Sequence, residues 1–354
     1  MRAMVISELT GVVEDALPLK LMNLPDPIPG RGEVLVDVLA CGVCHTELDE
    51  IEGRTAPARL PMIPGHQVVG RVAKLGPGAT RFQLGDRVGI AWIHWACGQC
   101  DFCLSGQENL CPAFSATGRD ANGGYAERTT VPEAFAFPIP AVYSDTEAAP
   151  LLCAGAVGFR SLRLAGLRDG GSLGLTGFGA SAHLVLQLAR YQHPDSRVFV
   201  FARSERERAF ARELGATWAG DVSDQSPVKL DCIIDTTPAW RPIVEALRNL
   251  KPGGRLVINA IRKEDADKGS LLDLDYSEHM WLEKEIKSVA NVTRQDVTEF
   301  LSLAALMGVR PEVEEYALED ANRALSELKA RRIRGAKVLR VSEGGTPHAG
   351  EAST

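Results

Sequence analysis

The stretch "GSLGLTGFGASAHLVLQLARY", residues 171–191, decides the fold of the second half of the chain. An apolar run ends at Gly177, a turn of small residues follows, and an amphipathic segment begins at Ser181. This order predicts a strand, a tight turn and a helix, and "GFGASA" matches the G-x-G-x-x-G/A pattern of dinucleotide-binding units. Gly177 allows the turn, Gly179 lets the backbone approach a pyrophosphate, and Ala182 permits close packing of helix on strand. The alternative is a glycine-rich turn that binds no ligand.

The alternation of strand and helix continues on the C-terminal side of this stretch. "RVFVFA", "LDCIIDTT" and "GGRLVINAI" are strand patterns, and "SERERAFARELGA" and "AWRPIVEALRNL" between them are helix patterns. Such alternation predicts a doubly wound parallel sheet. The first half instead carries short Val and Ile runs broken by Gly and Pro, such as "GEVLVDVLACG" and "HQVVGRVAKLG", which predict a β-rich domain.

The composition limits the classes of partner. The 354 residues suffice for two domains, and 39 basic against 46 acidic residues give a net charge of -7. This charge argues against nucleic acid and anionic membranes, both of which attract basic surfaces. No apolar run reaches the roughly 18 residues of a membrane span, and the N-terminal "MRAMVISELTG" lacks the apolar core of a signal peptide. We therefore expect a cytoplasmic protein.

Half of the eight cysteines lie in "CGQCDFCLSGQENLC". Gaps of two, two and seven residues separate Cys97, Cys100, Cys103 and Cys111. Four thiolates that turn toward one centre complete a tetrahedral zinc site, although an iron–sulfur cluster also takes four cysteines. Disulfides between cysteines this close would be strained, and they are rare in the cytoplasm. We expect zinc, and since a closed site leaves no position for substrate, we expect this zinc to be structural.

The motifs taken in order resemble one family. Cys41 and Cys44 lie in "ACGVCHTELDEIEG", His66 in "PGHQVVG" and Cys153 in "PLLCAGAVGF". With the four-cysteine segment, "GFGASA" and a closing "RGAKVLRV", the chain resembles the zinc-dependent medium-chain alcohol dehydrogenases over nearly its whole length.

The resemblance implies a fold of two domains, two zinc ions per chain, and a homodimer or homotetramer. The implied domains are a GroES-like catalytic domain of residues 1–153 and 294–354, with a structural-zinc lobe at about residues 95–113, and a Rossmann cofactor domain of residues 154–293.

The resemblance also implies the ligands of a catalytic zinc, which are Cys44, His66 and Cys153. Such a set leaves a fourth position for water or substrate. Zinc there would lower the pKa of an alcohol, which would then give hydride to a nicotinamide cofactor in a reversible reaction. The implied substrate is a primary or small secondary alcohol, or the matching aldehyde. Cys41 competes locally with Cys44 and is assigned to packing, and Cys232 is interpreted as a core thiol.

The segment that follows Cys44 contains three residues at positions of the family's proton relay. The resemblance implies that Thr46 contacts the reacting oxygen and passes its proton outward. His45 would contact the cofactor phosphates or join the relay, or else be a simple exposed histidine. Asp49 stands where many members carry a relay histidine, and a carboxylate there would change the pH optimum.

Two further departures lie close to the expected zinc. Glu47 replaces the usual Asp, and we expect it to support His66 as a hydrogen-bond acceptor. Gln67 replaces a Glu that can transiently bind the metal, so a negative charge is removed there. Trp92 matches an aromatic residue of the family's alcohol pocket, and the alternative is ordinary packing or a contact between subunits.

The second strand of the dinucleotide unit predicts the cofactor. An NAD-binding unit places Asp or Glu at the end of this strand, but here Ala202 takes the position, and Arg203 and Ser204 follow. Arginine binds phosphate in a bidentate manner, so we expect NADP(H) to be preferred over NAD(H). The alternative is a solvated helix start in which Glu205 and Glu207 neutralise the arginines.

Three other functions compete with an alcohol dehydrogenase. A polyol or other secondary-alcohol dehydrogenase of the same family would share every motif. A non-catalytic, zinc- and nucleotide-binding redox sensor would keep the fold without turnover. A zinc-free quinone reductase of the same fold is disfavoured by the intact set of Cys44, His66 and Cys153 together with Thr46.

Overall fold

The computed structural model describes residues 1–13, 17–330, 332 and 335–342. The chain divides into two compact units, Met1–Cys153 with Arg310–Thr354 and Ala154–Val309. The second unit ends at Val309 rather than at residue 293, because helix α8 (Arg294–Met307) packs against α4 (Ala156–Ala165). The last twelve residues of the expected catalytic domain, 343–354, lie outside the described residues. No described helix is long and apolar enough to cross a membrane.

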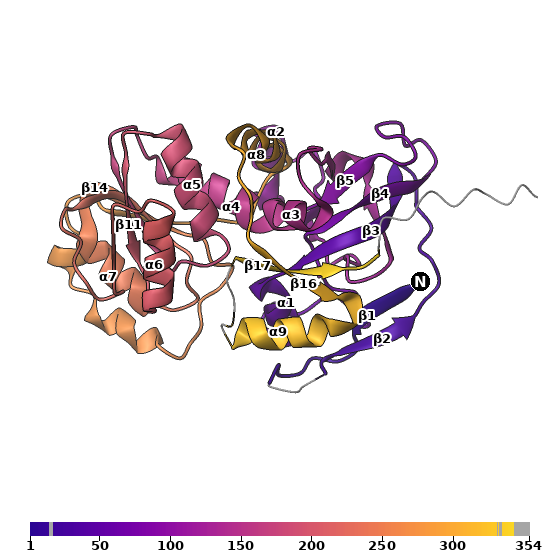
Figure 1. Cartoon of the computed structure of the whole chain (residues 1–354), viewed down its shortest axis with the longest axis horizontal. Helices are drawn as coiled ribbons and strands as arrows, with labels where there is room; N and C mark the ends of the chain where they lie inside the picture. The colour runs from indigo at the N-terminus through magenta and orange to yellow at the C-terminus, as the bar shows by residue number, and fades with distance from the viewer. Residues whose placement is uncertain (14–16, 331, 333–334, 343–354) are drawn as a thin grey trace, which may run out of the picture. The chain divides into compact units, whose positions relative to one another are not determined.

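The first unit is built on a seven-stranded sheet with the order β16-β17-β3-β4-β5-β9, and β8 also pairs with β3 (Figure 1). β3 is central and almost wholly buried, which explains its apolar run of eleven residues. β17 pairs with β3, so this late segment of the chain returns to the first unit. The sheet strands are β3 (Glu33–Val43), β4 (Val68–Leu75), β5 (Arg87–Ile90), β8 (Arg128–Pro132), β9 (Ala136–Pro138), β16 (Val313–Ala317) and β17 (Ala336–Arg340).

Among the described residues, two small sheets and four α-helices complete the first unit. β1 pairs with β2, and β6 pairs with β7, both antiparallel. Helix α1 follows β3 directly, and its packing against α9 joins the N-terminal and C-terminal parts of the unit. These elements are β1 (Arg2–Ile6), β2 (Leu19–Asn23), β6 (Ile93–Trp95), β7 (Ser115–Ala116), α1 (His45–Ile51), α2 (Asp101–Leu104), α3 (Asp145–Pro150) and α9 (Ala321–Lys329).

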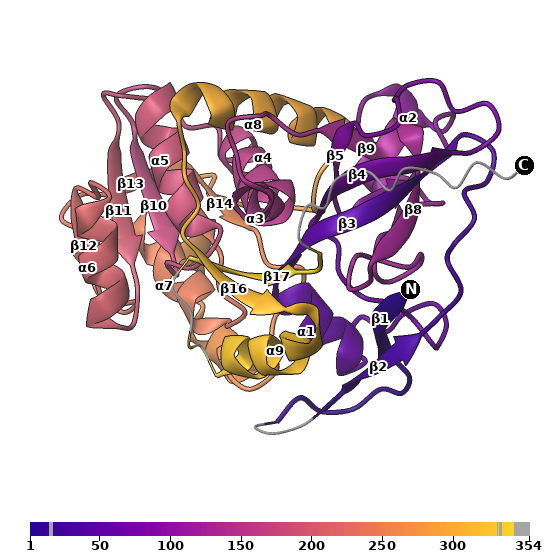
Figure 2. The same ribbon diagram turned by 45° about the vertical axis from the view of Figure 1, so that its right-hand side comes forward.

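The second unit contains a six-stranded parallel sheet with the order β12-β11-β10-β13-β14-β15 (Figure 2). In chain order this is 3-2-1-4-5-6, the doubly wound arrangement of dinucleotide-binding sheets, so the predicted parallel sheet is confirmed. The strands are β10 (Ser172–Thr176), β11 (Arg197–Phe201), β12 (Trp218–Gly220), β13 (Leu230–Asp235), β14 (Leu250–Ile258) and β15 (Glu285–Ser288).

Helices cover this sheet on both faces. α5 (Ala182–Gln192) packs on β10 and β11, and α6 (Glu205–Glu213) connects β11 to β12. α7 (Arg241–Asn249) connects β13 to β14, and because right-handed crossovers in opposite directions use opposite faces, it covers the other side. Its apolar residues pack on the sheet in a buried cluster that includes Phe199, Ile233, Leu247 and Leu256.

Candidate active site

The three expected ligands of the catalytic zinc come from different segments of the first unit. Cys44 is the N-cap of α1, His66 precedes β4, and Cys153 lies in a π-helical turn, Leu151–Gly155. Such turns are rare and are frequent at functional sites. His66 is fully buried and Cys153 is 9% exposed, so the fold brings these side chains together in a largely buried place.

The distances among these side chains suit a metal ion. His66 Nε2 lies 3.6 Å from Cys44 Sγ and 3.2 Å from Cys153 Sγ. Zinc at about 2.3 Å from sulfur and 2.0–2.1 Å from nitrogen, with tetrahedral angles, places these atoms about 3.6 Å apart. All three ligand atoms lie within 4.8 Å of one another. Cys41 is outside this group, because its buried thiol packs between the backbones of Gly65 and Gly124.

Glu47 contacts two of these three residues. Its Oε1 lies 2.6 Å from His66 Nδ1, and its Oε2 accepts a hydrogen bond of 2.8 Å from the backbone N–H of Cys44. The ring of His66 therefore turns Nε2 toward the cysteines, the orientation found in carboxylate–histidine–zinc groups. The second contact belongs to a capping box at the start of α1, so local helix geometry fixes this carboxylate.

The electrostatics of the group also favour a cation. Burial alone would lower the pKa of His66, but the nearby Glu47 and Cys44 raise it well above its ordinary value. The neighbouring Cys153 thiol and burial raise the pKa of Cys44 well above its ordinary value. Cys44 and His66 therefore hold their protons more tightly than usual here, and a divalent ion bound by both would displace these protons. The residues present therefore fit zinc.

The three expected relay residues differ in their surroundings. Thr46 is 7% exposed and its backbone N–H faces Cys44 Sγ at 3.4 Å, whereas His45 is exposed. Asp49 is buried one turn after Thr46, and its Oδ1 lies 2.5 Å from Nε of Arg54. The sequence analysis did not identify Arg54, because nothing in "EGRTAP" marks an arginine that folds back onto the preceding helix.

Arg54 belongs to a chain of alternating charges. It also forms an ion pair with Glu52, and Glu52 forms one with Lys329 of helix α9. Asp49 therefore pairs with the guanidinium of Arg54, and Glu52 pairs with the same guanidinium.

Two more polar side chains near the centre are buried. Gln67 is 3% exposed and packs against Gly42, where an added Cβ would lie 2.6 Å from its Oε1. Glu50 is fully buried on α1, and neither of its carboxylate oxygens has a hydrogen-bond partner among the described residues. Burial, followed by the charge of Glu47, raises the pKa of Glu50 well above its ordinary value.

The four-cysteine segment forms a second group. The Sγ atoms of Cys97, Cys100, Cys103 and Cys111 all lie within 4.8 Å of one another. The sulfurs of Cys97 and Cys103 are 3.9 Å apart, close to the roughly 3.8 Å of two thiolates on one tetrahedral zinc. Backbone N–H groups of Gln99 and Cys100 lower the pKa of Cys97 to about 6, which favours the thiolate that a metal requires.

The turn between β10 and α5 has the shape that a dinucleotide requires. Gly177 has φ +77, and an added Cβ would lie 2.9 Å from Thr237 Cγ2, so any other residue would be strained there. A Cβ at Gly179 would meet nothing within 4 Å, which leaves the backbone accessible to a ligand. Ala182 is fully buried at the first position of the eleven-residue helix α5.

The segment after β11 carries the residues expected to select the cofactor. Ala202 is buried, and Arg203 and Ser204 are exposed. Glu205 pairs with Arg208 and Arg212 rather than with Arg203. Ser204 is the N-cap of α6, and its hydroxyl lies 3.0 Å from an oxygen of Glu207. The two glutamates are therefore engaged with other partners than Arg203.

Trp92 has aromatic and cationic neighbours. It is 8% exposed, its ring centroid lies 5.0 Å from that of Phe114, and the guanidinium of Arg119 lies 5.2 Å from the ring. Arg119 forms an ion pair of 2.7 Å with Asp120. Packing thus accounts for much of the tryptophan surface, and a contact with substrate stays a prediction.

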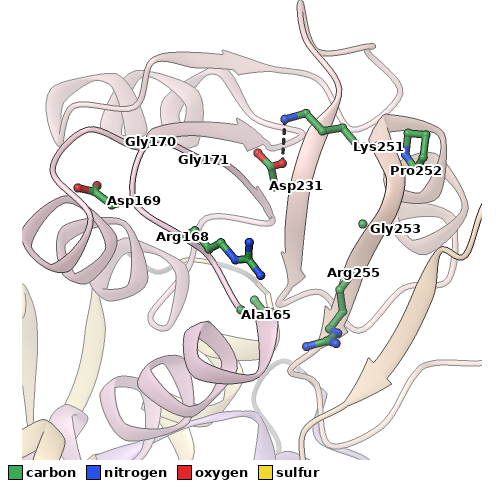
Figure 3. A pocket seen from close by; sticks show the side chains of 12 residues that line it. Ala165, Arg168, Asp169, Gly170, Gly171, Asp231, Lys251, Pro252, Gly253 and Arg255 are labelled. Carbon is green, nitrogen blue, oxygen red and sulfur yellow. Dashed lines mark hydrogen bonds and ion pairs between the residues drawn. The ribbon is translucent and has the colours of Figure 1, made fainter.

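A polar cavity of about 630 Å³ lies at the amino ends of β10, β13 and β14 (Figure 3). Arg168, Asp231, Lys251 and Arg255 line it, and Lys251 pairs with Asp231 at 2.8 Å. Dinucleotides bind beyond the carboxyl ends of the strands in such sheets, so this cavity is at the wrong edge for the cofactor.

Comparison with known proteins identifies the class of the protein first. Residues 30–141 match the family described as the alcohol dehydrogenase GroES-like domain. The chain is 46% identical to "Probable alcohol dehydrogenase AdhA" of Mycobacterium tuberculosis (strain CDC 1551 / Oshkosh), over 92% of this chain and 93% of that protein. It is 33% identical to an alcohol dehydrogenase of Geobacillus stearothermophilus, over 97% of this chain and the whole of that protein.

Solved structures agree with these relatives. A cinnamyl alcohol dehydrogenase of Sorghum bicolor superposes with a TM-score of 0.82 at 27% identity, over 96% of this chain and 97% of that one. A structure described as an NAD-dependent alcohol dehydrogenase superposes with a TM-score of 0.83 at 26% identity, over 97% of this chain and all of that one. The chain belongs to the zinc-dependent medium-chain alcohol dehydrogenase family, and the predicted GroES-like and Rossmann architecture is confirmed. Alcohol dehydrogenase activity follows from this membership.

Proposed function

We propose that the chain is a zinc-dependent alcohol dehydrogenase that interconverts a primary or small secondary alcohol with its carbonyl compound, preferably with NADP(H). The observation that carries this proposal is the arrangement around His66, whose Nε2 faces Cys44 and Cys153 while its Nδ1 faces Glu47. Two cysteines and one histidine are the donor set of the catalytic zinc of alcohol dehydrogenases, with a fourth position left open.

The residues around this group have distinct roles in the proposed reaction. A zinc ion held by Cys44, His66 and Cys153 supplies a Lewis acid that lowers the pKa of a bound alcohol. Thr46, one turn before Asp49 on the same face of α1, would accept the alcohol proton at its hydroxyl and pass it outward. Asp49 would receive that proton in place of the relay histidine, and His45 would take part at the exposed end of the path.

The experiment that tests the function is a screen of initial rates. Linear, branched, aromatic and polyhydroxy alcohols, and their carbonyl products, would be assayed with NADP(H) and NAD(H). We expect turnover of short or unbranched apolar alcohols, because the aromatic ring of Trp92 would favour them by size. A preference for polyols would favour the rival dehydrogenase, and the absence of turnover with every compound would favour a redox sensor.

We further propose that the four-cysteine group holds a second, structural zinc. The support is the 3.9 Å separation of the Cys97 and Cys103 sulfurs and the lowered pKa of Cys97. Metal analysis of the purified chain should give two zinc ions per chain. One zinc, or iron with acid-labile sulfide, would contradict this assignment.

The preference for NADP(H) rests on the segment after β11. No carboxylate follows the strand at Ala202, and the exposed Arg203 is not paired with Glu205 or Glu207 in the contacts above. Solved neighbours do not decide the question, since one is described as NAD-dependent and another, at 23% identity, as bound to NADP. The test is kcat/KM for each cofactor in the native protein and in Arg203→Ala. A clear native preference for NAD(H) would contradict the proposal.

We propose that the chain forms a homo-oligomer through the edge of its parallel sheet. β15 pairs only with β14 among the described strands, and all four of its residues are exposed. Ile286 of this strand exposes 43% of its surface, and Tyr276, Trp281 and Leu282, which precede the strand, expose 50–65%. An unpaired strand edge with exposed apolar neighbours can pair with the same edge of a second copy of the chain. Light scattering should show a dimer or tetramer, and Ile286→Lys should dissociate it; a native monomer would refute the idea.

The cysteines also suit a reducing compartment, and we propose the cytoplasm. All eight are free thiols, and six of them belong to the two groups above. Only reduced thiols can bind zinc, so an oxidising compartment would work against both sites. Fractionation of cells that produce the chain tests this placement.

A further inference from the structure

A buried ion pair lies at the carboxyl end of the parallel sheet and has no part in the roles assigned above. Asp235, the last residue of β13, is fully buried, and the Lys263 side chain after β14 is 6% exposed. Lys263 Nζ pairs with Asp235 Oδ2 and donates a hydrogen bond of 2.6 Å to the carbonyl of Thr237. The other oxygen, Oδ1, accepts hydrogen bonds of 2.5 Å from Thr176 and 2.8 Å from Thr237.

These contacts join three segments that border the expected cofactor site. Thr176 ends β10 and directly precedes Gly177, the first glycine of the dinucleotide turn. Thr236 follows β13 and donates to the Thr176 carbonyl from its backbone and its hydroxyl, at 3.0 and 2.9 Å. Lys263 adds the loop after β14. One carboxylate thus holds the turn at Gly177 and the two loops beside it.

The ion pair lies at the place in the sheet where dinucleotides bind. β10 and β13 are neighbours in the sheet, and the strand order reverses between them. Dinucleotides bind in the crevice beyond the carboxyl ends at such a reversal. The methyl group of Thr237 lies only 2.9 Å from the position that a Cβ of Gly177 would take, so a shift of this loop would press on the turn.

We propose that Asp235 and Lys263 are positioning residues of the dinucleotide site, which fix the turn at Gly177 and the loop after β14 in the arrangement that binds the cofactor. A buried ion pair adds little net stability over apolar residues of the same size, so its placement points to geometry rather than to strength. This inference rests on the proposed nicotinamide cofactor.

The chain offers a matched control on the same strand. Asp231 lies near the amino end of β13 and pairs with Lys251 at 2.8 Å, in the cavity of Figure 3. Both members of that pair are more than 40% exposed, and the pair lies at the opposite edge of the sheet from the turn. The double variants Asp235→Asn/Lys263→Met and Asp231→Asn/Lys251→Met therefore remove the same charges at the two ends of one strand.

The experiment titrates NADPH and NADH into each full-length variant by fluorescence, with zinc content and thermal midpoint measured alongside. The Asp235/Lys263 double variant leaves no uncompensated charge, so we expect it to fold with its zinc content unchanged. We expect its cofactor to bind about tenfold more weakly, as if one hydrogen bond to a charged ligand were lost. The KM for the cofactor should rise by the same factor, while the KM for alcohol changes less than about twofold. The control pair should change neither value.

Two results would overturn the inference, and a third would overturn the proposed dehydrogenase function on which it rests. Native cofactor affinity in the Asp235/Lys263 double variant would make the pair a packing feature, and loss of the fold would make it a stability element. Lys263→Arg, which keeps the charge with a different reach, should bind cofactor with intermediate affinity. If the native protein binds neither nucleotide, the proposed function fails and not only the role of this pair.

Discussion

The contact between Glu47 and His66 gives the sharpest prediction for the catalytic centre. One carboxylate touches the His66 ring at 2.6 Å and the Cys44 backbone at 2.8 Å, and it is fully buried. It therefore orients two of the three proposed ligands at once. Glu47→Gln keeps the shape and one acceptor oxygen but loses the charge that supports the imidazole, and Glu47→Ala loses both contacts.

The magnitude follows from the role of such partners in metal sites. Changing the group behind a ligating histidine typically weakens metal binding by about 10- to 100-fold, which is about 1.4 to 2.7 kcal/mol. We expect Glu47→Gln at the lower end, since only the charge is lost. Glu47→Ala should reach the upper end, because the capping box that positions Cys44 is lost as well.

The control variant is Glu50→Gln on the same helix. Glu50 is as deeply buried as Glu47, but its oxygens have no hydrogen-bond partner among the described residues. Its raised pKa means that the carboxyl carries its proton to higher pH, so glutamine changes the local charge least. We expect its zinc affinity to stay within about twofold of native, because none of the ligand contacts that outer residues provide is removed.

The assay is competition for zinc between the protein and a chromogenic chelator, followed by metal analysis. The four-cysteine group serves as an internal reference, because neither glutamate contacts it in the interactions described, so each variant should keep that zinc. A Glu47→Gln protein that holds both ions as tightly as the native protein would refute the reasoning. Equal loss from Glu50→Gln would show that any buried carboxyl group on α1 matters and that the contact with His66 does not.

Three further predictions concern single residues. Cys44→Ala should abolish turnover in a folded protein, whereas Cys100→Ala should lower the thermal midpoint, because a structural zinc contributes folding energy; equal effects in activity and melting assays would contradict this. Gln67→Glu should move the alkaline limb of the pH profile of alcohol oxidation upward, because a carboxylate behind the metal lowers its effective positive charge, and an unchanged profile would show that the side chain does not sense the metal. Burial lowers the pKa of His94 in the folded protein. The neutral side chain therefore contributes fully to the free energy of unfolding above the unfolded pKa of about 6.5, and this contribution is lost as the pH falls. His94→Gln should therefore lose less stability than native between pH 7 and pH 5 in urea titrations, and equal losses would contradict it.

The sequence predicted those parts of the fold in which the signal is local. "GFGASA" identified the turn after β10 because strand, glycines and helix follow one another within 21 residues. Two strands of the same sheet, β12 and β15, were not predicted. β15 reads "EIKS", with one apolar residue and all four exposed, and it exists only because β14 offers backbone groups to pair with. Pairing of this kind leaves no mark on composition.

The candidate site shows the same division between local and long-range signals. The gaps within the four-cysteine segment were enough to predict a metal, since its ligands come from fifteen residues. Cys153 could not be joined to Cys44 and His66 by any spacing, and only the resemblance to a family placed it there. The pair of Asp235 and Lys263 lies 28 residues apart in the sequence and has no motif. The structure was needed to bring these two together.

Asp49 shows why residue type alone does not define a role in the relay. From the sequence, a carboxylate in place of a histidine is simply a base with a different pH optimum. In the structure this carboxylate faces Arg54, which is held in turn by Glu52, and Glu52 is held by Lys329. The carboxylate proposed to receive the alcohol proton is therefore held by a guanidinium that also pairs with a second carboxylate. The residue that positions Asp49 is thus Arg54, five positions beyond the one that the motif contains.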